Sequence, residues 1–327
     1  MIDFRESTVK SNFKTSIVVP VYKEENSIKF FLDRVEAIAN NEKWNYEIIF
    51  CLDPSPDNTY SVIKEQIKRN SNIKLIYLSR RFGQPAATLA GIFNCAGDIC
   101  IVIDVDLQDP PEIIPLMINK WKEGYNVVYA KRKSRRGETF LKKIVSAIGY
   151  KIINSFTDIK IPRDTGDFRL IDRVIIEELR KLKETHGFLR GLVAFLGYKQ
   201  TFVEYNRDER VTGKGNYNKY FGSLKIGLNG LICFSSRPLQ IISLIGIIIA
   251  IIGFLLGIWY LIQKLFLTIP LTPGISTTVI VVTFFSGVQL LSLGMIGEYI
   301  GRIYDEVKSR PPYIINDKFN FKINKKD

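Results

Sequence analysis

Short apolar segments alternate with amphipathic ones from the start of the chain to about residue 210. The apolar segments are rich in Val and Ile, and the amphipathic ones repeat apolar residues at helical spacing. A strand followed by a helix, repeated in this way, predicts an α/β domain in which helices pack on a mostly parallel sheet. The expected strands are 15–22, 46–52, 73–79, 98–104 and 126–132, and the expected helices are 26–40, 58–70, 85–96, 111–121 and 138–156.

The pattern changes toward the C-terminus, where charged residues disappear. No charge lies between residues 238 and 263, and a second uncharged run extends from 265 to 297. Because about 20 apolar residues suffice to cross a bilayer, these runs predict two transmembrane helices, at about 238–263 and 275–299. A buried helical hairpin in a soluble core is the alternative.

The charges that flank the two runs predict their orientation. Arg237 precedes the first run and Lys264 lies in the connection, while three basic residues follow the second run: Arg302, Lys308 and Arg310. The positive-inside rule then places both ends in the cytoplasm and the connection outside. The first residues are polar and show no signal-peptide pattern, so we expect an integral protein of the cytoplasmic membrane with its first domain in the cytosol.

Residues 214–236 join the two regions. Lys219 and Lys225 lie there among Tyr220 and Phe221, a mixture typical of an amphipathic helix in the lipid headgroup layer. An ordinary surface helix that packs on the domain is the alternative. The predicted order is a cytosolic domain 1–213, an interfacial helix 214–236, a transmembrane hairpin 237–303 and an exposed cytosolic tail 304–327.

The composition indicates what kind of partner the protein binds. The 327 residues include 46 Lys and Arg against 33 Asp and Glu, and the net charge of +13 favours nucleic acid, acidic lipid or a phosphorylated substrate as partner. The single His and the four Cys, which lack CxxC spacing, speak against a zinc site. The glycine-rich fingerprints of dinucleotide-binding and Walker-type folds are missing from the sequence.

The segment IDVDLQDPPE, residues 103–112, places four acids directly after an expected buried strand. Carboxylates this close repel one another unless something positive lies among them. On an extended segment Asp104 and Asp106 point the same way, with Gln108 on the same side, and such oxygen ligands suit Mg²⁺ or Mn²⁺. A solvated loop is the alternative, but ligands of parallel sheets bind beyond the carboxyl ends of the strands.

Four ordered motifs carry a resemblance that covers nearly the whole chain: VVPVYKEE at 18–25, CLDPSPDNT at 51–59, LSRRFGQ at 78–84 and VIDVDLQDPPE at 102–112. They resemble the inverting family-two glycosyltransferases with a GT-A fold, and more narrowly the polyisoprenyl-phosphate glycosyltransferases. The resemblance implies transfer of a sugar from a nucleotide sugar to a polyprenyl phosphate, with glucose from UDP-glucose as the first expectation and an amino-arabinose derivative or mannose next. It also implies a homo-oligomer, with a tetramer as the expected form.

The resemblance implies roles for named residues on the donor side. Pro20, Tyr22 and Glu24 would line the nucleotide pocket, and Asp53 would contact the base or ribose, although it could instead cap a helix or make a turn. The acid segment would supply further donor contacts from Asp104, Val105, Asp106 and Gln108, and its two aspartates and Gln108 would hold the metal. Lys23, Leu52 and Pro54 depart from the usual Asn, Asp and Gly, which leaves the base preference open.

An anionic acceptor beside an anionic donor calls for basic residues from several segments. We expect Arg132, Arg135 and Arg207 to contact phosphates, because the arginine fork grips phosphate in two places. Supporting roles for the acceptor phosphate fall to Arg169, Arg210 and Lys214. A solvated or headgroup-facing patch is the alternative for residues 131–136.

Two further acids, Asp164 and Asp167, belong to the motif DTGDFR, which the resemblance puts on the acceptor side. We expect Asp106, Asp164, Arg132 and Arg207 to be catalytic, with Asp164 in a positioning role. A lipid monophosphate is largely ionised at neutral pH, so no general base is required. A processive polysaccharide synthase, a non-catalytic nucleotide-sugar binder and a nucleic-acid binder are the competing interpretations, and we expect no nucleic acid partner.

Overall fold

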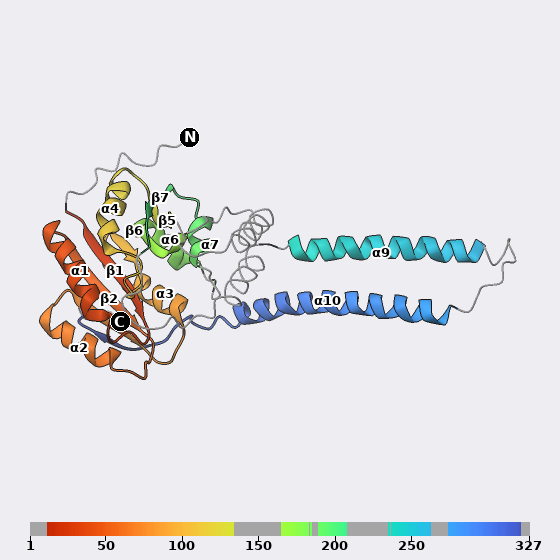
Figure 1. Ribbon diagram of the computed structural model, residues 1–327, viewed down its shortest axis with the longest axis horizontal. Helices are drawn as coiled ribbons and strands as arrows, with labels where there is room; N and C mark the ends of the chain where they lie inside the picture. The colour runs from red at the N-terminus through yellow and green to blue at the C-terminus, as the bar shows by residue number, and fades with distance from the viewer. Residues whose placement is uncertain are drawn as a thin grey trace.

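The computed structural model describes residues 12–133, 165–182, 184, 189–207, 235, 237–262 and 274–321. Figure 1 shows an α/β domain from which two long helices, α9 (Arg237–Ile262) and α10 (Ile275–Val307), extend side by side. The predicted interfacial segment, apart from Ser235, and the predicted helix 138–156 lie outside the described residues.

The described part of the chain forms one sheet with the strand order β7-β5-β6-β4-β1-β2-β3-β8. The strands β1 to β4 are parallel, β5 is parallel to β7, and β6 and β8 run antiparallel to their neighbours. The predicted mostly parallel α/β sheet is therefore confirmed. The bounds are β1 (Lys14–Val21), β2 (Asn45–Leu52), β3 (Ile73–Leu78), β4 (Ile99–Val102), β5 (Val127–Arg132), β6 (Thr165–Asp172), β7 (Gln200–Tyr205) and β8 (Ile315–Phe319).

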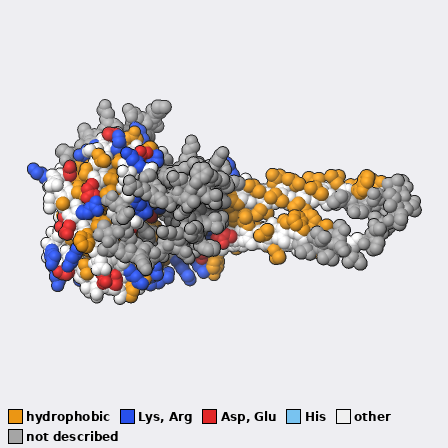
Figure 2. All heavy atoms as spheres, viewed as in Figure 1, with side chains coloured by type: hydrophobic (Ala, Val, Ile, Leu, Met, Phe, Trp, Pro, Cys, Tyr) orange, Lys and Arg blue, Asp and Glu red, His pale blue; other side chains and the backbone are white. Residues whose placement is uncertain are grey.

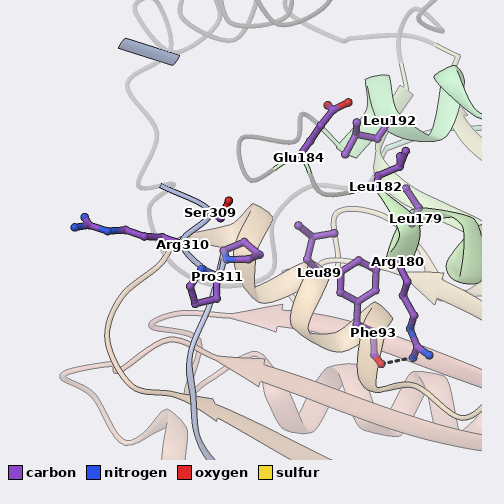
Figure 3. Close-up of a pocket in the computed structure, with 11 residues that line it drawn as sticks. Leu89, Phe93, Leu179, Arg180, Leu182, Glu184, Leu192, Ser309, Arg310 and Pro311 are labelled. Carbon is purple, nitrogen blue, oxygen red and sulfur yellow. Dashed lines mark hydrogen bonds between the residues drawn. The ribbon is translucent and has the colours of Figure 1, made fainter. Parts of the chain in front are cut away.

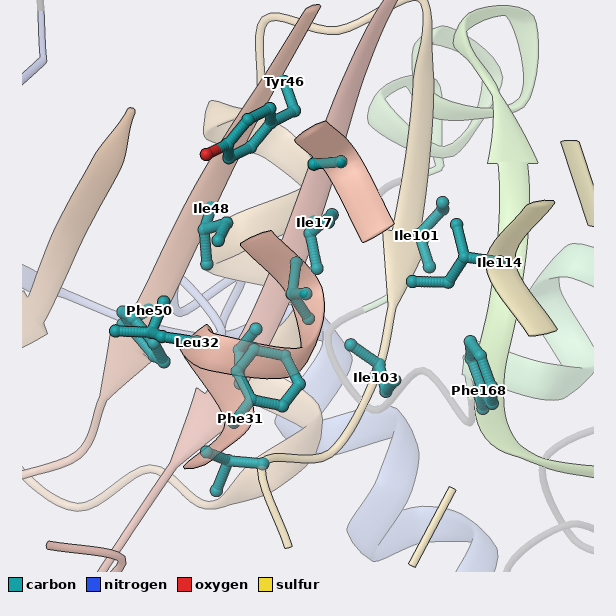
Figure 4. Packing of buried hydrophobic residues seen from close by; sticks show 14 of the residues in the cluster. Ile17, Phe31, Leu32, Tyr46, Ile48, Phe50, Ile101, Ile103, Ile114 and Phe168 are labelled. Atoms are coloured by element: carbon teal, nitrogen blue, oxygen red, sulfur yellow. The ribbon is translucent and has the colours of Figure 1, made fainter. Parts of the chain in front are cut away.

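Helices cover both faces of the sheet, so the strands read as nearly continuous apolar runs. Successive residues of β1 point to opposite faces, with Ile17 and Val19 in one hydrophobic cluster and Val18 in the other. Figure 4 shows the first cluster, where Phe31 and Leu32 pack against the strands. The helices are α1 (Ile28–Asn41), α2 (Thr59–Arg69), α3 (Gln84–Asn94), η1 (Pro111–Ile113), α4 (Ile114–Lys122), α6 (Arg173–Lys181) and α7 (Leu189–Phe195).

The strand β6 enters the sheet between β4 and β5 and runs against both. Its register pairs Val102 of β4 with Arg169. When this register is continued by two residues, Asp167 comes level with Asp104. An antiparallel strand thus begins where β4 ends, and it brings residues Thr165–Arg169 of the motif DTGDFR to the acid segment.

The C-terminal tail corrects the prediction of an exposed extension. Residues Ile315–Phe319 form β8, which pairs with the edge strand β3. The Lys64 ammonium lies 3.3 Å from the centre of the Phe319 ring, and the Asn320 side chain donates to the carbonyls of Ser71 and Ile73. The sequence gives little sign of this strand because its central residues are polar and exposed.

The helix α9 is apolar enough to cross a membrane. Its first part, Arg237–Leu255, has a mean hydropathy of 2.5 and none of it is buried inside the protein. By length and composition it is the one such helix among the described residues. The Tyr299 hydroxyl of α10 donates to the carbonyl of Ser235, 2.7 Å away, and Figure 2 shows apolar side chains along both helices. The second predicted span therefore stays a prediction.

Candidate active site

The acid segment follows β4 at the carboxyl edge of the parallel strands. Val105 and Leu107 are buried in the core, whereas Asp104, Asp106 and Gln108 between them are partly exposed. The three polar side chains are partly exposed, but the segment is not the extended one that the sequence predicted, because β4 ends at Val102 and Leu107 has a φ of 58°. Because the Val105 side chain belongs to the hydrophobic core, its predicted donor contact cannot come from the side chain.

Asp104 lies in surroundings rich in negative charge. Burial and the nearby carboxylates of Asp167, Asp106 and Asp109, in that order, raise its pKa to about 8, and Arg132 only partly offsets them. The Gln84 side chain donates to its Oδ1 at 2.8 Å. The ionised carboxylate would therefore gain from a cation, and the donor atoms present are oxygens, which suit Mg²⁺ or Mn²⁺.

The described residues do not by themselves complete a metal site. No three His, Cys, Asp or Glu side chains within the described ranges gather closely enough to hold an ion. The predicted ligand set of Asp104, Asp106 and Gln108 includes an amide and leaves positions for substrate oxygens, as is usual for Mg²⁺. That ligand set fits the chemistry and stays a prediction.

The other two acids of the segment have different partners. Glu112 forms a two-pronged ion pair with Arg34 of α1, with N to O distances of 2.8 and 2.6 Å. Asp109 is 1% exposed and accepts a hydrogen bond from the Tyr205 hydroxyl. Only Asp104 and Asp106 of the four acids therefore remain available to a ligand at this edge.

The two arginines that the sequence favoured most meet on Asp109. Arg132 ends β5 and Arg207 follows β7, and each has a nitrogen 3.5 Å from the Asp109 Oδ1. The Arg132 Nε also donates to the Tyr205 oxygen at 3.1 Å. The structure thus brings Arg132 and Arg207 together, and it adds Asp109 and Tyr205, which the sequence analysis had given no role.

On the β6 side, Asp167 is held by two arginines. Its Oδ1 accepts from Arg190 at 3.1 Å and from Arg169 at 3.0 Å. Burial by itself would raise the pKa of Asp167, but Arg190 and then Arg169 lower it below the ordinary value. Asp167 therefore stays ionised next to Asp104, and Arg190 is a site residue that sequence reasoning missed.

Arg169 corrects a prediction. Its side chain is 0% exposed, it packs against the Tyr129 ring, and it donates to the Gly166 carbonyl and to Asp167. Burial lowers its pKa. In place of the expected direct contact with an acceptor phosphate, Arg169 holds Asp167 in position.

Asp53 is held by two backbone groups. It is 3% exposed, and its two oxygens accept the backbone N–H groups of Phe82 and Gly83 at 3.0 and 2.8 Å. Gly83 has a φ of 92°, a conformation that favours glycine. Asp53 therefore fixes the loop after β3, which agrees with the turn role that the sequence left open, and its contact with base or ribose stays a prediction.

The remaining donor-side predictions fall on the end of β1. Pro20 is buried in the strand, and the Glu24 carboxylate accepts from the Ser27 hydroxyl at 2.7 Å. The Tyr22 ring is partly exposed and has the Arg81 guanidinium 4.1 Å from its centre. Arg81 belongs to the loop that Asp53 holds, so this pair joins that loop to the end of β1.

Four predicted residues lie outside the described ranges: Arg135, Asp164, Arg210 and Lys214. A cavity of about 320 Å³ between α3, α6 and the segment after α10 contains none of the predicted site residues in its lining. Its walls include Leu89, Phe93 and Leu182 (Figure 3). The candidate site is therefore the open carboxyl edge of the sheet.

The sequence profile described as "Glycosyl transferase family 2" matches residues 16–180. The chain belongs to this family. A Bacillus subtilis protein named "Uncharacterized glycosyltransferase YkcC" is 47% identical over 93% of this chain and 94% of its own length. The "Bactoprenol glucosyl transferase" of Shigella phage SfII is 39% identical over 92% of this chain and 97% of its own length.

Solved structures also resemble this glycosyltransferase at a greater distance. A crystal structure of glucosyl-3-phosphoglycerate synthase from Mycobacterium tuberculosis, in complex with Mn²⁺, UDP-glucose and phosphoglyceric acid, is 16% identical with a TM-score of 0.46. The match covers 68% of this chain and 80% of that chain.

In a family 2 glycosyltransferase, the two charged groups at this edge have complementary uses. Asp104 and Asp106 form a negative region that can accept a cation, and Arg132 and Arg207 form a positive region that can bind phosphate. Both regions lie where ligands of parallel sheets bind. The arrangement can therefore stabilise a departing diphosphate, which is the charge that develops in sugar transfer from a nucleotide donor.

Proposed function

We propose that the protein transfers a hexose, glucose from UDP-glucose in the first place, to a polyprenyl phosphate with inversion at the sugar. The observation that carries the proposal is the meeting of Asp104 and Asp106 with the Arg132 and Arg207 pair at one sheet edge. Relatives named bactoprenol glucosyl transferase, similar over nearly their full length, support the lipid acceptor and the sugar.

The donor diphosphate binds at the acid segment. Asp104, Asp106 and Gln108 would hold Mg²⁺ or Mn²⁺, which when bound supplies positive charge to the leaving diphosphate. Arg132 and Arg207 contact phosphate oxygens, and Asp167, kept ionised by Arg190 and Arg169, borders the acceptor side. The lipid phosphate attacks as an anion, so the mechanism requires no proton acceptor from the protein.

A membrane hairpin of α9 and α10 delivers the lipid to this edge. The length and apolar character of α9 support the first crossing. The pairing of β8 with β3 supports the second, because β8 follows α10 and must lie on the same side of the bilayer as the rest of the sheet. An even number of crossings satisfies this condition. The catalytic domain and the C-terminus then share the cytosolic side, and association of the helices into a homo-oligomer is part of the proposal.

The test is a transfer assay with the full-length protein. Radiolabelled UDP-glucose and undecaprenyl phosphate are expected to give label that extracts into chloroform, and this product requires Mg²⁺ or Mn²⁺. Parallel reactions with other nucleotide sugars identify the donor. Label that stays in the aqueous phase with every donor would refute the proposal.

A matched pair of variants tests the acid segment. Asp106→Asn is expected to lower turnover by about a hundredfold or more, because it removes half of the charge that the two aspartates offer a cation. It should also remove the metal dependence of UDP binding, measured by calorimetry. Asp33→Asn changes an exposed acid of α1 and is expected to leave both measurements unchanged. Undiminished metal-dependent binding in Asp106→Asn would contradict the metal assignment.

A further inference from the structure

Asp109 is buried and contacts other side chains of the site, so it can act on a substrate only through them. It lies at the end of the acid segment, yet it is 1% exposed and so has almost no surface to offer a substrate. Its partners come from two other parts of the chain: Arg132 at the end of β5, and Tyr205 and Arg207 at the end of β7. One buried carboxylate therefore joins three segments.

The contacts form a closed arrangement around one oxygen atom. The Asp109 Oδ1 accepts from the Tyr205 hydroxyl and lies 3.5 Å from both arginines. The Tyr205 oxygen in turn accepts from the Arg132 Nε at 3.1 Å. Gly166 closes the far side, since a Cβ there would come within 2.9 Å of the Arg132 Nη2. The position of the Arg132 guanidinium is thus fixed from three directions.

The positive charges of the two arginines explain why a carboxylate is needed between them. Two guanidinium groups on the same oxygen atom repel each other, and without a negative charge between them they would separate toward water. The Arg132 and Arg207 side chains are 17% and 34% exposed, so each keeps part of its surface for a ligand. A buried carboxylate can hold both without competing for the phosphate.

We infer that Asp109 is a positioning residue, which fixes the spacing and direction of Arg132 and Arg207 and touches no substrate itself. The inference rests on the proposed function for its effect on turnover, because the arginines are there assigned to phosphate oxygens. Its structural content, the holding of two arginines by one acid, is independent of the reaction.

The first measurement needs no substrate. Full-length protein is treated with phenylglyoxal, and the modification rates of Arg132, Arg207 and Arg34 are read by mass spectrometry. Asp109→Asn is expected to speed modification of Arg132 and Arg207 by about fivefold, because the two side chains lose their shared partner and turn to solvent, while Arg34 is unchanged. Tyr205→Phe, which keeps the acid and removes one hydroxyl, is expected to give a smaller increase at Arg132.

Glu112→Gln is the matched control. It changes another acid of the same segment, and its partner is Arg34. It should speed modification of Arg34 and leave Arg132 and Arg207 at their original rates. If Asp109→Asn leaves all three rates unchanged, the inference is wrong.

The second measurement asks whether Asp109 positions the two arginines or only stabilises the fold. With UDP-glucose and undecaprenyl phosphate, Asp109→Asn is expected to lower kcat by about tenfold or more without raising KM for the lipid phosphate, because the site keeps its positive charges and loses their arrangement. In an Arg132→Ala background, Asp109→Asn should lower kcat by a much smaller factor than it does in the original protein, since Asp109 acts through Arg132. Full additivity of the two changes would overturn the inference.

The two measurements also distinguish the two proposals. If the original protein makes no lipid-linked product with any nucleotide sugar, the proposed function fails, and the phenylglyoxal rates still decide the inference. If the product forms at the same rate with Asp109→Asn, the proposed function stands and the inference fails.

Discussion

Glu47 is another buried acid, near the amino ends of the parallel strands and thus opposite the candidate site. Its side chain is 1% exposed and lies 2.6 Å from the Lys14 ammonium and 2.8 Å from that of Lys74. Ser16 and the backbone N–H of Ala96 donate to its other oxygen. Burial alone would raise its pKa, but the two lysines and these hydrogen bonds hold it at about 2. This carboxylate joins β1, β2 and β3 at their first residues.

The pKa of Glu47 predicts a loss of stability in acid. The folded pKa of about 2 lies below the ordinary 4.5, so the stabilisation is full above pH 4.5 and disappears as the pH falls toward 2. This difference between the two pKa values corresponds to roughly 3 kcal/mol of folding stability at neutral pH. Glu47→Gln should therefore lower the free energy of unfolding by about that amount at pH 7 and by less at pH 3, measured by denaturant unfolding of the detergent-solubilised protein.

Glu65→Gln is the control for this prediction. Glu65 and Arg69 form an exposed pair one helical turn apart, which is worth about 0.5 kcal/mol or less. The unfolding free energy of the Glu65→Gln protein should stay close to that of the original protein at both pH values. An equal loss at pH 7 and pH 3 in Glu47→Gln would mean that the variant acts through packing and not through charge.

The predictable residues of the site are those that depend on local pattern. Asp104, Asp106 and Gln108 alternate with apolar neighbours, so the sequence marks them as the polar positions of the segment, whereas the turn at Leu107, with a φ of 58°, has no such signal. The partners of Asp109 and Asp167 are set by pairings between distant segments, such as Tyr205 with Asp109, which are 96 residues apart. Sequence spacing carries no signal for such pairs, and Arg190 was missed for the same reason.

At the scale of elements, the strands β1 to β5 and the helices between them could be predicted because each carries its own periodicity. The two antiparallel strands could not. The strand β6 is mostly buried, with Phe168, Leu170 and Ile171 in the core, but these apolar residues do not say between which strands it lies. The strand β8 has only Ile315 and Phe319 as partly buried apolar residues, so it depends on main-chain pairing, which leaves no side-chain pattern.

The strand β8 is expected to protect the edge of the sheet. Removal of residues 314–327 leaves β3 with an unpaired edge and removes the contacts of Phe319 with Tyr60 and Lys64. We expect the thermal midpoint of the solubilised protein to fall by about 5 °C or more and aggregation to begin earlier. Removal of residues 322–327 alone keeps β8 and should leave the midpoint unchanged. Equal midpoints for both truncated proteins would show that β8 contributes no stability.

At the scale of the whole molecule, the sheet and the long helices constrain each other. The strand β3 precedes both helices in the chain and β8 follows them, yet the two strands are paired. A chain with a single crossing would put β8 on the wrong side of the bilayer. The fold therefore predicts that residues before α9 and after α10 are reached from the same compartment.

Cysteine labelling in whole cells tests this arrangement. In a Cys233→Ser background, a membrane-impermeant maleimide should label Thr272→Cys in intact cells, because the proposed hairpin puts the connection between the helices outside. Glu65→Cys on α2 and Asn316→Cys on β8 are expected to react only after the cells are opened. Reaction of these last two positions from opposite sides would contradict the hairpin.

The pairing of β8 with β3 also fixes an order of events during synthesis. The ribosome makes β3 early, then both long helices, and β8 last. Until β8 has been made, the outer edge of β3 has no strand beside it, and an open edge of this kind is where other chains can attach. Completion of the sheet must therefore wait for the helices that precede β8, and in the proposed membrane hairpin this would couple maturation of the α/β domain to the insertion machinery of the cell.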